Sequence, residues 1–156
     1  MRNRNTLRRR TAFAAMLLGS TALAVLPADA AFAGPSCTVA GCSTTFNDSP
    51  MEAWAYFNWC RKGDSTGAWT VSEPTCTSGG ASQDTFYLDS GGHTPLGQDW
   101  DAFRVDAGWC YRVKFVVSFG SDFTRTYDRR GQSAAWVKVA DNADAHILAQ
   151  TNTSPC

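Results

Sequence analysis

Few residues in this chain could act as a general acid or base. Its two histidines are His93, within the Gly-rich segment 91–95, and His146, between Ala145 and Ile147 in a stretch that favours a strand. A histidine within a strand is usually structural, whereas a loop histidine is free to contact a partner. His93 is therefore a candidate contact residue, and no neighbouring residue identifies either histidine as catalytic.

Paired carboxylates offer a second route to hydrolysis. Asp99 and Asp101 flank Trp100 and would share one face of a strand, but an Asp-x-Asp near a turn usually ends a solvated loop. A small secreted ribonuclease would need a glutamate base, and the two glutamates, Glu52 and Glu73, lie outside the strand-rich segment. Residues 63–67 match G-x-S-x-G but form a turn between predicted strands, and H-E-x-x-H and phosphate-binding motifs are absent. We therefore expect no catalytic residue, no metal and no cofactor.

Six tryptophans provide candidate contact residues of another kind. Packing of a core must use several of them. Trp100 has an aspartate on each side, so we expect it to be the most exposed tryptophan. An exposed aromatic ring beside carboxylates suits either a sugar or a protein partner.

The strands that would carry these residues are clearest between residues 109 and 139. Tyr111, Val113, Phe115 and Val117 alternate with Arg112, Lys114, Val116 and Ser118, which is the period of a strand with one apolar face and one more polar face. Segments 123–127 and 136–139 follow, with turns at Gly120 and Gly131, so the sequence predicts a three-stranded meander. It also predicts a hairpin from segments 102–105 and 109–111.

Frequent turns elsewhere indicate seven or eight short strands. The sequence therefore predicts a small all-β domain, an antiparallel β-sandwich or a partly closed barrel. Segment 50–62 is ambiguous. Ser49-Pro50-Met51-Glu52 resembles a helix capping box, but the aromatic run 53–59 favours a strand. We expect a strand there, with a short helix as the alternative.

The N-terminal 33 residues have the features of a secretory signal peptide. Five arginines precede a small, apolar stretch, and Ala31-Phe32-Ala33 forms an A-x-A cleavage site. Cleavage would leave 123 residues with nine basic and thirteen acidic side chains, a net charge of −4. A mildly acidic chain argues against nucleic acid as the main partner, and we expect no membrane association after cleavage.

Residues 34–50 are rich in Gly, Ser, Thr and Pro and predict an extended N-terminal arm ahead of a single β domain at 51–156. Such a segment is either disordered or becomes ordered on a partner, along a sheet edge or in a cleft. The candidate partner-binding residues in the arm are Thr38, Val39, Thr44 and Phe46, beside His93 and Trp100 in the domain.

Six cysteines follow the leader: Cys37, Cys42, Cys60, Cys76, Cys110 and Cys156. An even number in a small exported chain predicts three disulfides, for which 15 connectivities are possible. Our hypothesis is pairing between neighbours along the chain, 37–42, 60–76 and 110–156. A metal site is disfavoured because there is no C-x-x-C spacing and no adjacent histidine.

The leader, the six cysteines and two sequence stretches resemble small exported proteins of filamentous actinobacteria. The stretches are Trp109-Cys110-Tyr111-Arg112-Val113 and 126–133, followed by Trp136-Val137-Lys138-Val139. Over residues 34–156 the chain is most similar to the adaptor subunit of umbrella toxin particles. That resemblance implies a non-catalytic β domain that links a large repeat-containing toxin subunit to a trypsin-like lectin, and an N-terminal segment that inserts into a partner.

The residues and the resemblance together predict a secreted, extracellular protein-binding module. An adaptor in an antibacterial toxin complex is the first hypothesis, and an inhibitor of a secreted protease is the second. A carbohydrate-binding module, which would need coplanar exposed aromatic rings, is the third. A small hydrolase or ribonuclease is the last.

Overall fold

The structure is a computed structural model that describes residues 37, 41–76 and 82–156. The predicted signal peptide at 1–33 and the candidate residues Thr38 and Val39 lie outside the described residues and remain predictions. The described part contains no helix, and hence none able to cross a membrane. It contains nine strands: β1 (Thr44–Asn47), β2 (Ala53–Tyr56), β3 (Trp69–Thr70), β4 (Thr85–Leu88), β5 (Ala102–Val105), β6 (Cys110–Val117), β7 (Phe123–Asp128), β8 (Ala135–Lys138) and β9 (Ala143–Thr151).

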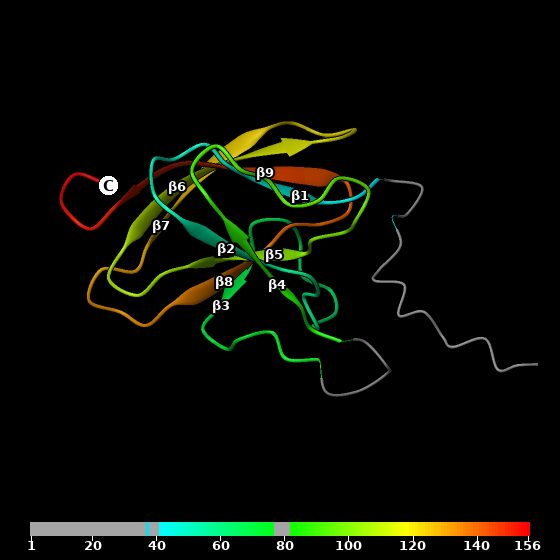
Figure 1. The fold of residues 1–156 in the computed structure, drawn as a ribbon, viewed down its shortest axis with the longest axis horizontal. Helices are drawn as coiled ribbons and strands as arrows, with labels where there is room; N and C mark the ends of the chain where they lie inside the picture. Colours follow the sequence, from blue (N-terminus) through cyan, green and yellow to red (C-terminus); the bar gives the residue numbers. More distant parts are fainter. Residues whose placement is uncertain (1–36, 38–40, 77–81) are drawn as a thin grey trace, which may run out of the picture.

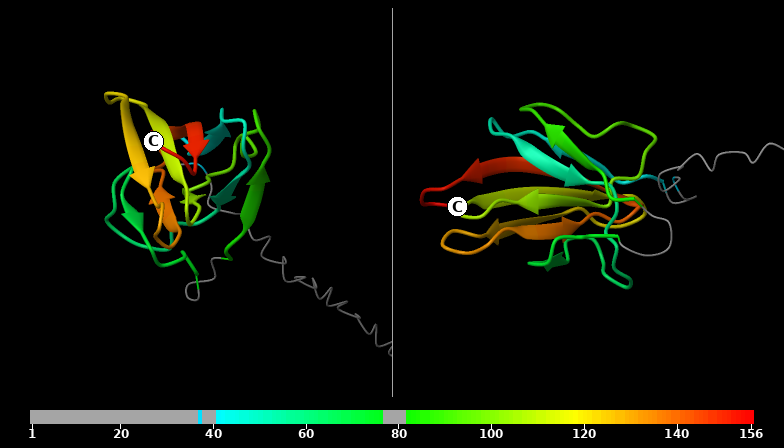
Figure 2. Two further views of the ribbon diagram at one scale, coloured as in Figure 1. Left: turned by 90° about the vertical axis from the view of Figure 1, so that its left-hand side faces the viewer. Right: turned by 60° about the horizontal axis from the view of Figure 1, so that its bottom comes forward.

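The strands form two sheets, so the all-β prediction is confirmed (Figures 1 and 2). One sheet has the order β1-β9-β6-β7 and the other the order β3-β8-β5-β2-β4. The sheets are not closed into a barrel, which favours the sandwich over the barrel alternative. All neighbouring strands are antiparallel except β1 and β9, which are parallel.

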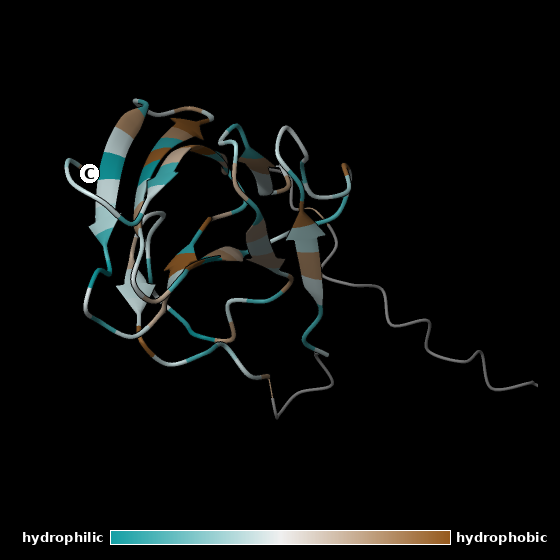
Figure 3. Ribbon diagram, turned by 60° about the vertical axis from the view of Figure 1, so that its left-hand side comes forward, coloured by the Kyte–Doolittle hydropathy of each residue, from teal (hydrophilic) through white to brown (hydrophobic). Residues whose placement is uncertain are grey.

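The hydrophobic core lies between the two sheets. Tyr111, Val113 and Phe115 of β6 are fully buried, as their alternation predicts, and Phe103 and Val137 face them from the other sheet. Figure 3 shows the same alternation of apolar and polar residues along the strands. A second, smaller cluster of aromatic residues packs on the outer side of the five-stranded sheet: Trp54, Tyr56, Trp59 and Trp136.

The predicted three-stranded meander is wrong in its last strand. β6 and β7 form a hairpin as expected, but β8 pairs with β5 and β3 in the other sheet. The predicted hairpin of segments 102–105 and 109–111 is wrong for the same reason, because β5 and β6 belong to different sheets. Alternation along a strand shows which residues are buried. It does not show to which sheet the strand belongs, because both sheets direct their apolar faces at the same core.

Segment 50–62 contains strand β2 and no helix, so the strand expectation is confirmed. Ser49 does not cap a helix. Its hydroxyl donates to the Asn47 side chain at 2.8 Å and accepts from the Met51 backbone N–H at 3.3 Å. These bonds fold the chain between β1 and β2 into a tight turn around the fully buried Asn47.

The sheet begins earlier than residue 51, which corrects the boundary expected between arm and domain. Residues 44–47 form β1, which pairs with β9 along the register Thr44↔Asp144 to Asn47↔Ile147. Ser43, Thr45 and Asn47 are completely buried. The second half of the predicted arm is therefore part of the folded domain, because β1 pairs with β9 and the side chains of Ser43 and Asn47 are hydrogen-bonded inside it.

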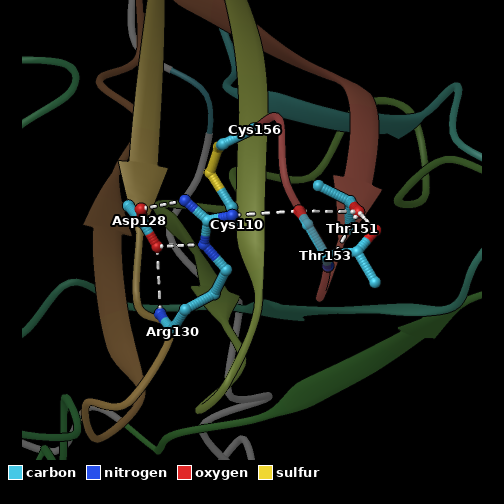
Figure 4. A network of polar contacts seen from close by, with 6 residues as sticks. All are labelled: Cys110, Asp128, Arg130, Thr151, Thr153 and Cys156. Carbon is cyan, nitrogen blue, oxygen red and sulfur yellow. Dashed lines mark hydrogen bonds and ion pairs between the residues drawn. A yellow bond between two sulfur atoms is a disulfide. The ribbon is translucent and has the colours of Figure 1, made fainter.

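The three disulfides pair neighbours along the chain, as predicted: Cys37–Cys42, Cys60–Cys76 and Cys110–Cys156. The last one connects β6 to the C-terminus across 46 residues of sequence. Figure 4 shows a second restraint at this end, where Arg130 pairs with Asp128 and donates to the Thr153 carbonyl oxygen at 2.9 Å. The C-terminal segment is thus held from both sides.

Candidate partner-binding site

The most exposed apolar side chain in the described residues is Phe119, at the turn between β6 and β7. Gly120 donates a backbone hydrogen bond of 3.2 Å to Val117, which closes the turn. Phe119 is 98% exposed and has a φ of 62°. The left-handed conformation costs a residue with a side chain about 1–2 kcal/mol, and glycine normally occupies this turn position. Both solvent exposure and backbone conformation therefore disfavour phenylalanine at residue 119.

The turn that presents Phe119 is held from two sides. Ser118 donates a 2.8 Å hydrogen bond to the Asn142 carbonyl oxygen in the turn between β8 and β9. Asp122 accepts from the Val117 N–H at 3.1 Å and pairs with Lys114 at 3.0 Å. The Lys114 hydrogen bond and the Val117 N–H lower the pKa of the Asp122 carboxyl group. These hydrogen bonds therefore fix the backbone of the turn that carries the Phe119 ring.

Figure 1 places this turn at the end of the molecule opposite the C-terminus. Residue 41 and the β8–β9 turn are at the same end, since a Cβ on Gly41 would lie 3.0 Å from the Asp141 carbonyl oxygen. This end therefore gathers segments from the beginning, the middle and the end of the domain.

A groove of about 430 Å³ opens next to the β6–β7 hairpin. Val117, Phe123 and Arg125 line it from the hairpin, and Ser65 and Asn142 line it from neighbouring loops. The guanidinium group of Arg125 lies 5.3 Å from the centre of the Phe123 ring and donates to the Gly67 carbonyl oxygen at 2.9 Å. No carboxylate pairs with Arg125 within the ranges that the structure describes. The groove thus combines three apolar side chains and four polar ones with one arginine that has no carboxylate partner in the described residues.

The structure brings together two of the predicted contact residues, Phe46 and His93. Their ring centres are 5.5 Å apart, and His146 stacks on the other side of Phe46 at 4.5 Å. His146 also contacts Asp48, with 2.8 Å between Nδ1 and the carboxylate. Thr44 belongs to the same strand but is only 6% exposed, so its side chain offers little contact surface.

Trp100 is buried, and the expectation that it is the most exposed tryptophan is wrong. It is 3% exposed and packs edge-on against Phe57 at 5.0 Å and Phe86 at 5.4 Å. The flanking aspartates do not keep Trp100 exposed to solvent, because both accept hydrogen bonds from groups inside the protein. Trp69, at 53%, is the most exposed tryptophan among the described residues.

Asp99, Asp101 and Asp141 bring their carboxylates within 4.8 Å of one another. Ser43 donates to Asp99 from both its backbone N–H and its hydroxyl, each at 2.7 Å. Asp101 accepts from the Trp59 N–H at 3.0 Å and lies 3.5 Å from the Lys138 ammonium group. Burial raises the pKa of both Asp99 and Asp101. Asp99 and Asp101 thus hold residues 43 and 59 against the start of β5.

The aromatic rings on the outer side of the five-stranded sheet do not form a flat platform. Trp54 and Tyr87 meet at 70°, and Tyr56 and Trp136 meet at 88°. The coplanar rings that a carbohydrate-binding face requires are absent from these two pairs.

Comparison with known proteins identifies no relative: no family model, no curated protein and no solved structure matches this chain. Sequence reasoning placed a turn at Gly120 but missed Phe119, one residue before it. The sequence did contain a signal: a large aromatic residue lies in the predicted turn between two strands, where small or polar residues are usual.

Proposed function

We propose that this chain is a secreted, non-catalytic protein-binding module that acts as an adaptor in an extracellular assembly. Phe119 carries the proposal. It is 98% exposed, in a left-handed conformation, on a turn fixed by hydrogen bonds to Asn142 and Asp122. The backbone conformation and the solvent exposure both disfavour phenylalanine at residue 119. A partner that buries the ring explains why it is there.

The energetics agree with such a role. Burying a phenylalanine side chain contributes about 1.5–3 kcal/mol, and anchors of this kind dominate protein interfaces. Because the turn is already ordered, little conformational entropy is lost when the ring enters a pocket on the partner. Phe119 would therefore act as a preorganised anchor.

Two further observations support the extracellular assembly. Three disulfides are typical of exported domains, and the predicted leader agrees with export. An adaptor also needs a second surface, for which the structure offers Tyr87, which is 39% exposed on β4 and packs against Trp54 on the outer side of the five-stranded sheet. The resemblance to umbrella-particle adaptors implies the same arrangement, with a large repeat-containing subunit and a trypsin-like lectin as the two partners.

A protease inhibitor is the second candidate, because it too presents an exposed side chain on a fixed loop. An inhibitory loop that enters a protease cleft by strand-like pairing needs an extended backbone with negative φ. The φ of 62° at Phe119 and the tight Val117–Gly120 turn do not provide one. The adaptor therefore fits the geometry better.

Affinity purification of the tagged protein from its native culture medium, followed by mass spectrometry, tests the proposal. The wild-type protein should recover a large repeat protein and a protease-like protein in stoichiometric amounts, and Phe119→Gly should lose at least one of them. Val71→Ala is the control, since Val71 is 52% exposed and follows β3 at an edge of the five-stranded sheet. Recovery of the chain by itself would contradict the adaptor role, and recovery of one active protease alone would favour the inhibitor.

A further inference from the structure

The four sheet edges of this domain are not equally protected. β1 is covered on its outer side by residues 91–94, since Asn47 donates to the Gly92 carbonyl oxygen at 2.8 Å and Thr94 donates to the Thr45 carbonyl oxygen at 3.0 Å. β3 has two residues and β4 has four. β7 has six, with no proline, no bulge and no covering segment in the described residues, and its one inward-facing charge is Arg125. Proline, bulges and covering segments close a long edge to any partner strand, whereas an inward-facing charge excludes only strands that do not neutralise it.

The backbone groups that β7 turns outward can be assigned from its pairing with β6. Arg129 donates to the Trp109 carbonyl oxygen, and the register continues without a shift from Cys110↔Asp128 to Phe115↔Phe123. Hydrogen-bonded pairs alternate in an antiparallel ladder, so Phe123, Arg125 and Tyr127 bond to β6. Thr124 and Thr126 therefore direct their N–H and C=O groups away from β6. No other residue in the described part of the chain bonds to these groups.

The side chains of this edge also provide a binding groove. Phe123 and Arg125 are on the face of β7 that turns towards the other sheet, and both line the groove of about 430 Å³. A strand added along β7 would direct every second side chain into that groove. Main-chain hydrogen bonds between β7 and the added strand would then give affinity. The groove would determine which side chains of the added strand are accepted.

We propose that β7 is a docking edge for an extended, acidic segment of a partner protein. The proposal rests on the proposed binding function and specifies how the partner binds. The segment pairs with the backbone of Thr124 and Thr126, directs an apolar side chain onto Val117 and Phe123, and directs a carboxylate at Arg125. Phe119, at the end of the same hairpin, anchors the partner beyond the strand.

Charge complementarity favours an acidic segment of another protein over a second copy of this chain. Arg125 is exposed and has no carboxylate partner in the described residues. Pairing of β7 with β7 of a second copy would bring another arginine to the groove instead of a carboxylate, and like charges across a strand pair are destabilising.

The test uses the full secreted chain and the complex recovered from culture medium. Thr126→Pro removes an outward N–H that β6 does not use, which an edge strand tolerates, and Thr126→Val keeps it. Arg125→Glu reverses the groove charge, and Arg112→Glu makes the same change on the exposed outer side of β6. Thermal unfolding of each variant checks that it folds. We expect Thr126→Pro and Arg125→Glu each to reduce partner recovery at least ten-fold relative to its control.

Hydrogen–deuterium exchange on the wild-type complex provides the direct measurement, and the amides of Thr124 and Thr126 should become protected. Recovery of the partner by Thr126→Pro at the level of Thr126→Val, or unchanged exchange at these amides, would overturn the docking edge and leave the adaptor proposal in place. A recovered complex that contains only copies of this chain would overturn the acidic segment. If the wild-type protein recovers nothing, the proposed function fails, and this inference fails with it.

Discussion

The Tyr127 hydroxyl donates a 3.0 Å hydrogen bond to the backbone carbonyl oxygen of Gly67. The bond connects β7 of the four-stranded sheet to the loop that leads into β3 of the other sheet. Tyr127 is 6% exposed, and burial raises the pKa of its hydroxyl group. Arg125 donates to the same carbonyl oxygen, so one backbone atom joins the two sheets beside the proposed groove.

We expect Gly67→Ala to destabilise the domain by about 2–3 kcal/mol, from backbone strain plus crowding. Gly67 has a φ of 82°, and a Cβ there would lie 3.1 Å from the Arg125 guanidinium and 3.2 Å from the Tyr127 hydroxyl. Gly63→Ala is the matched control, with a φ of 83° and open space around the Cβ, and should cost only about 1 kcal/mol. Denaturant unfolding measures both. Equal losses would show that the contact with Arg125 and Tyr127 is unimportant.

The Phe119→Gly variant should fold at least as stably as the wild-type protein, with a gain of up to about 1 kcal/mol. Glycine removes the cost of the left-handed backbone, although it also loses more entropy on folding. Phe115→Ala, in the buried half of the same hairpin, should cost about 3–5 kcal/mol. Thermal unfolding distinguishes the two. A large loss for Phe119→Gly would show that the ring stabilises the fold, and its proposed role as an anchor would then have to be abandoned.

Strand positions were predictable where the alternation of residues decides burial. Tyr111, Val113 and Phe115 are buried as expected, because a period of two on a strand has only one apolar face. The sheet to which each strand belongs was not predictable in this way. β8 has the same pattern in either sheet, and its pairing with β5 depends on contacts distant in sequence.

The site was less predictable because exposure depends on what packs around a residue. Trp100 is between two aspartates, yet those carboxylates turn inward to bond Ser43 and Trp59, and the ring follows them into the core. Phe119 reads in sequence as one more apolar residue of a β-rich stretch. Its exposure appears only when Gly120 closes the turn and leaves the ring outside.

Removal of the Cys110–Cys156 disulfide should lower stability by about 2–5 kcal/mol, measured by unfolding of a Cys110→Ser, Cys156→Ser double variant. The disulfide closes a loop of 46 residues, against 5 for Cys37–Cys42. The entropy removed from the unfolded chain grows with loop length, so the double variant at Cys37 and Cys42 should lose less. The reverse order would show that contacts of the native state, and not chain entropy, dominate these bonds.

Asp99 provides a prediction of pH dependence. Burial raises the pKa of this carboxyl group, so the folded protein binds its proton more tightly than the unfolded chain does. The Asp99 contribution to the unfolding free energy therefore falls as pH rises from the unfolded value of 3.8 through the raised folded value. Asp99→Asn does not titrate. Its stability relative to the wild-type protein should improve between pH 3 and pH 7, measured by denaturant unfolding at each pH.

Asp128 should show the opposite trend and so completes the pH test. Hydrogen bonds from the Arg130 side chain and backbone lower the pKa of Asp128 to about 2, so the folded protein releases this proton more readily than the unfolded chain. Its stabilising contribution is present above pH 3.8 and is lost as pH falls towards 2. Asp128→Asn should therefore lose stability relative to the wild-type protein as pH rises from 2 to 5. If both variants follow the same trend, general charge repulsion controls the pH dependence, and the local partners of Asp99 and Asp128 do not.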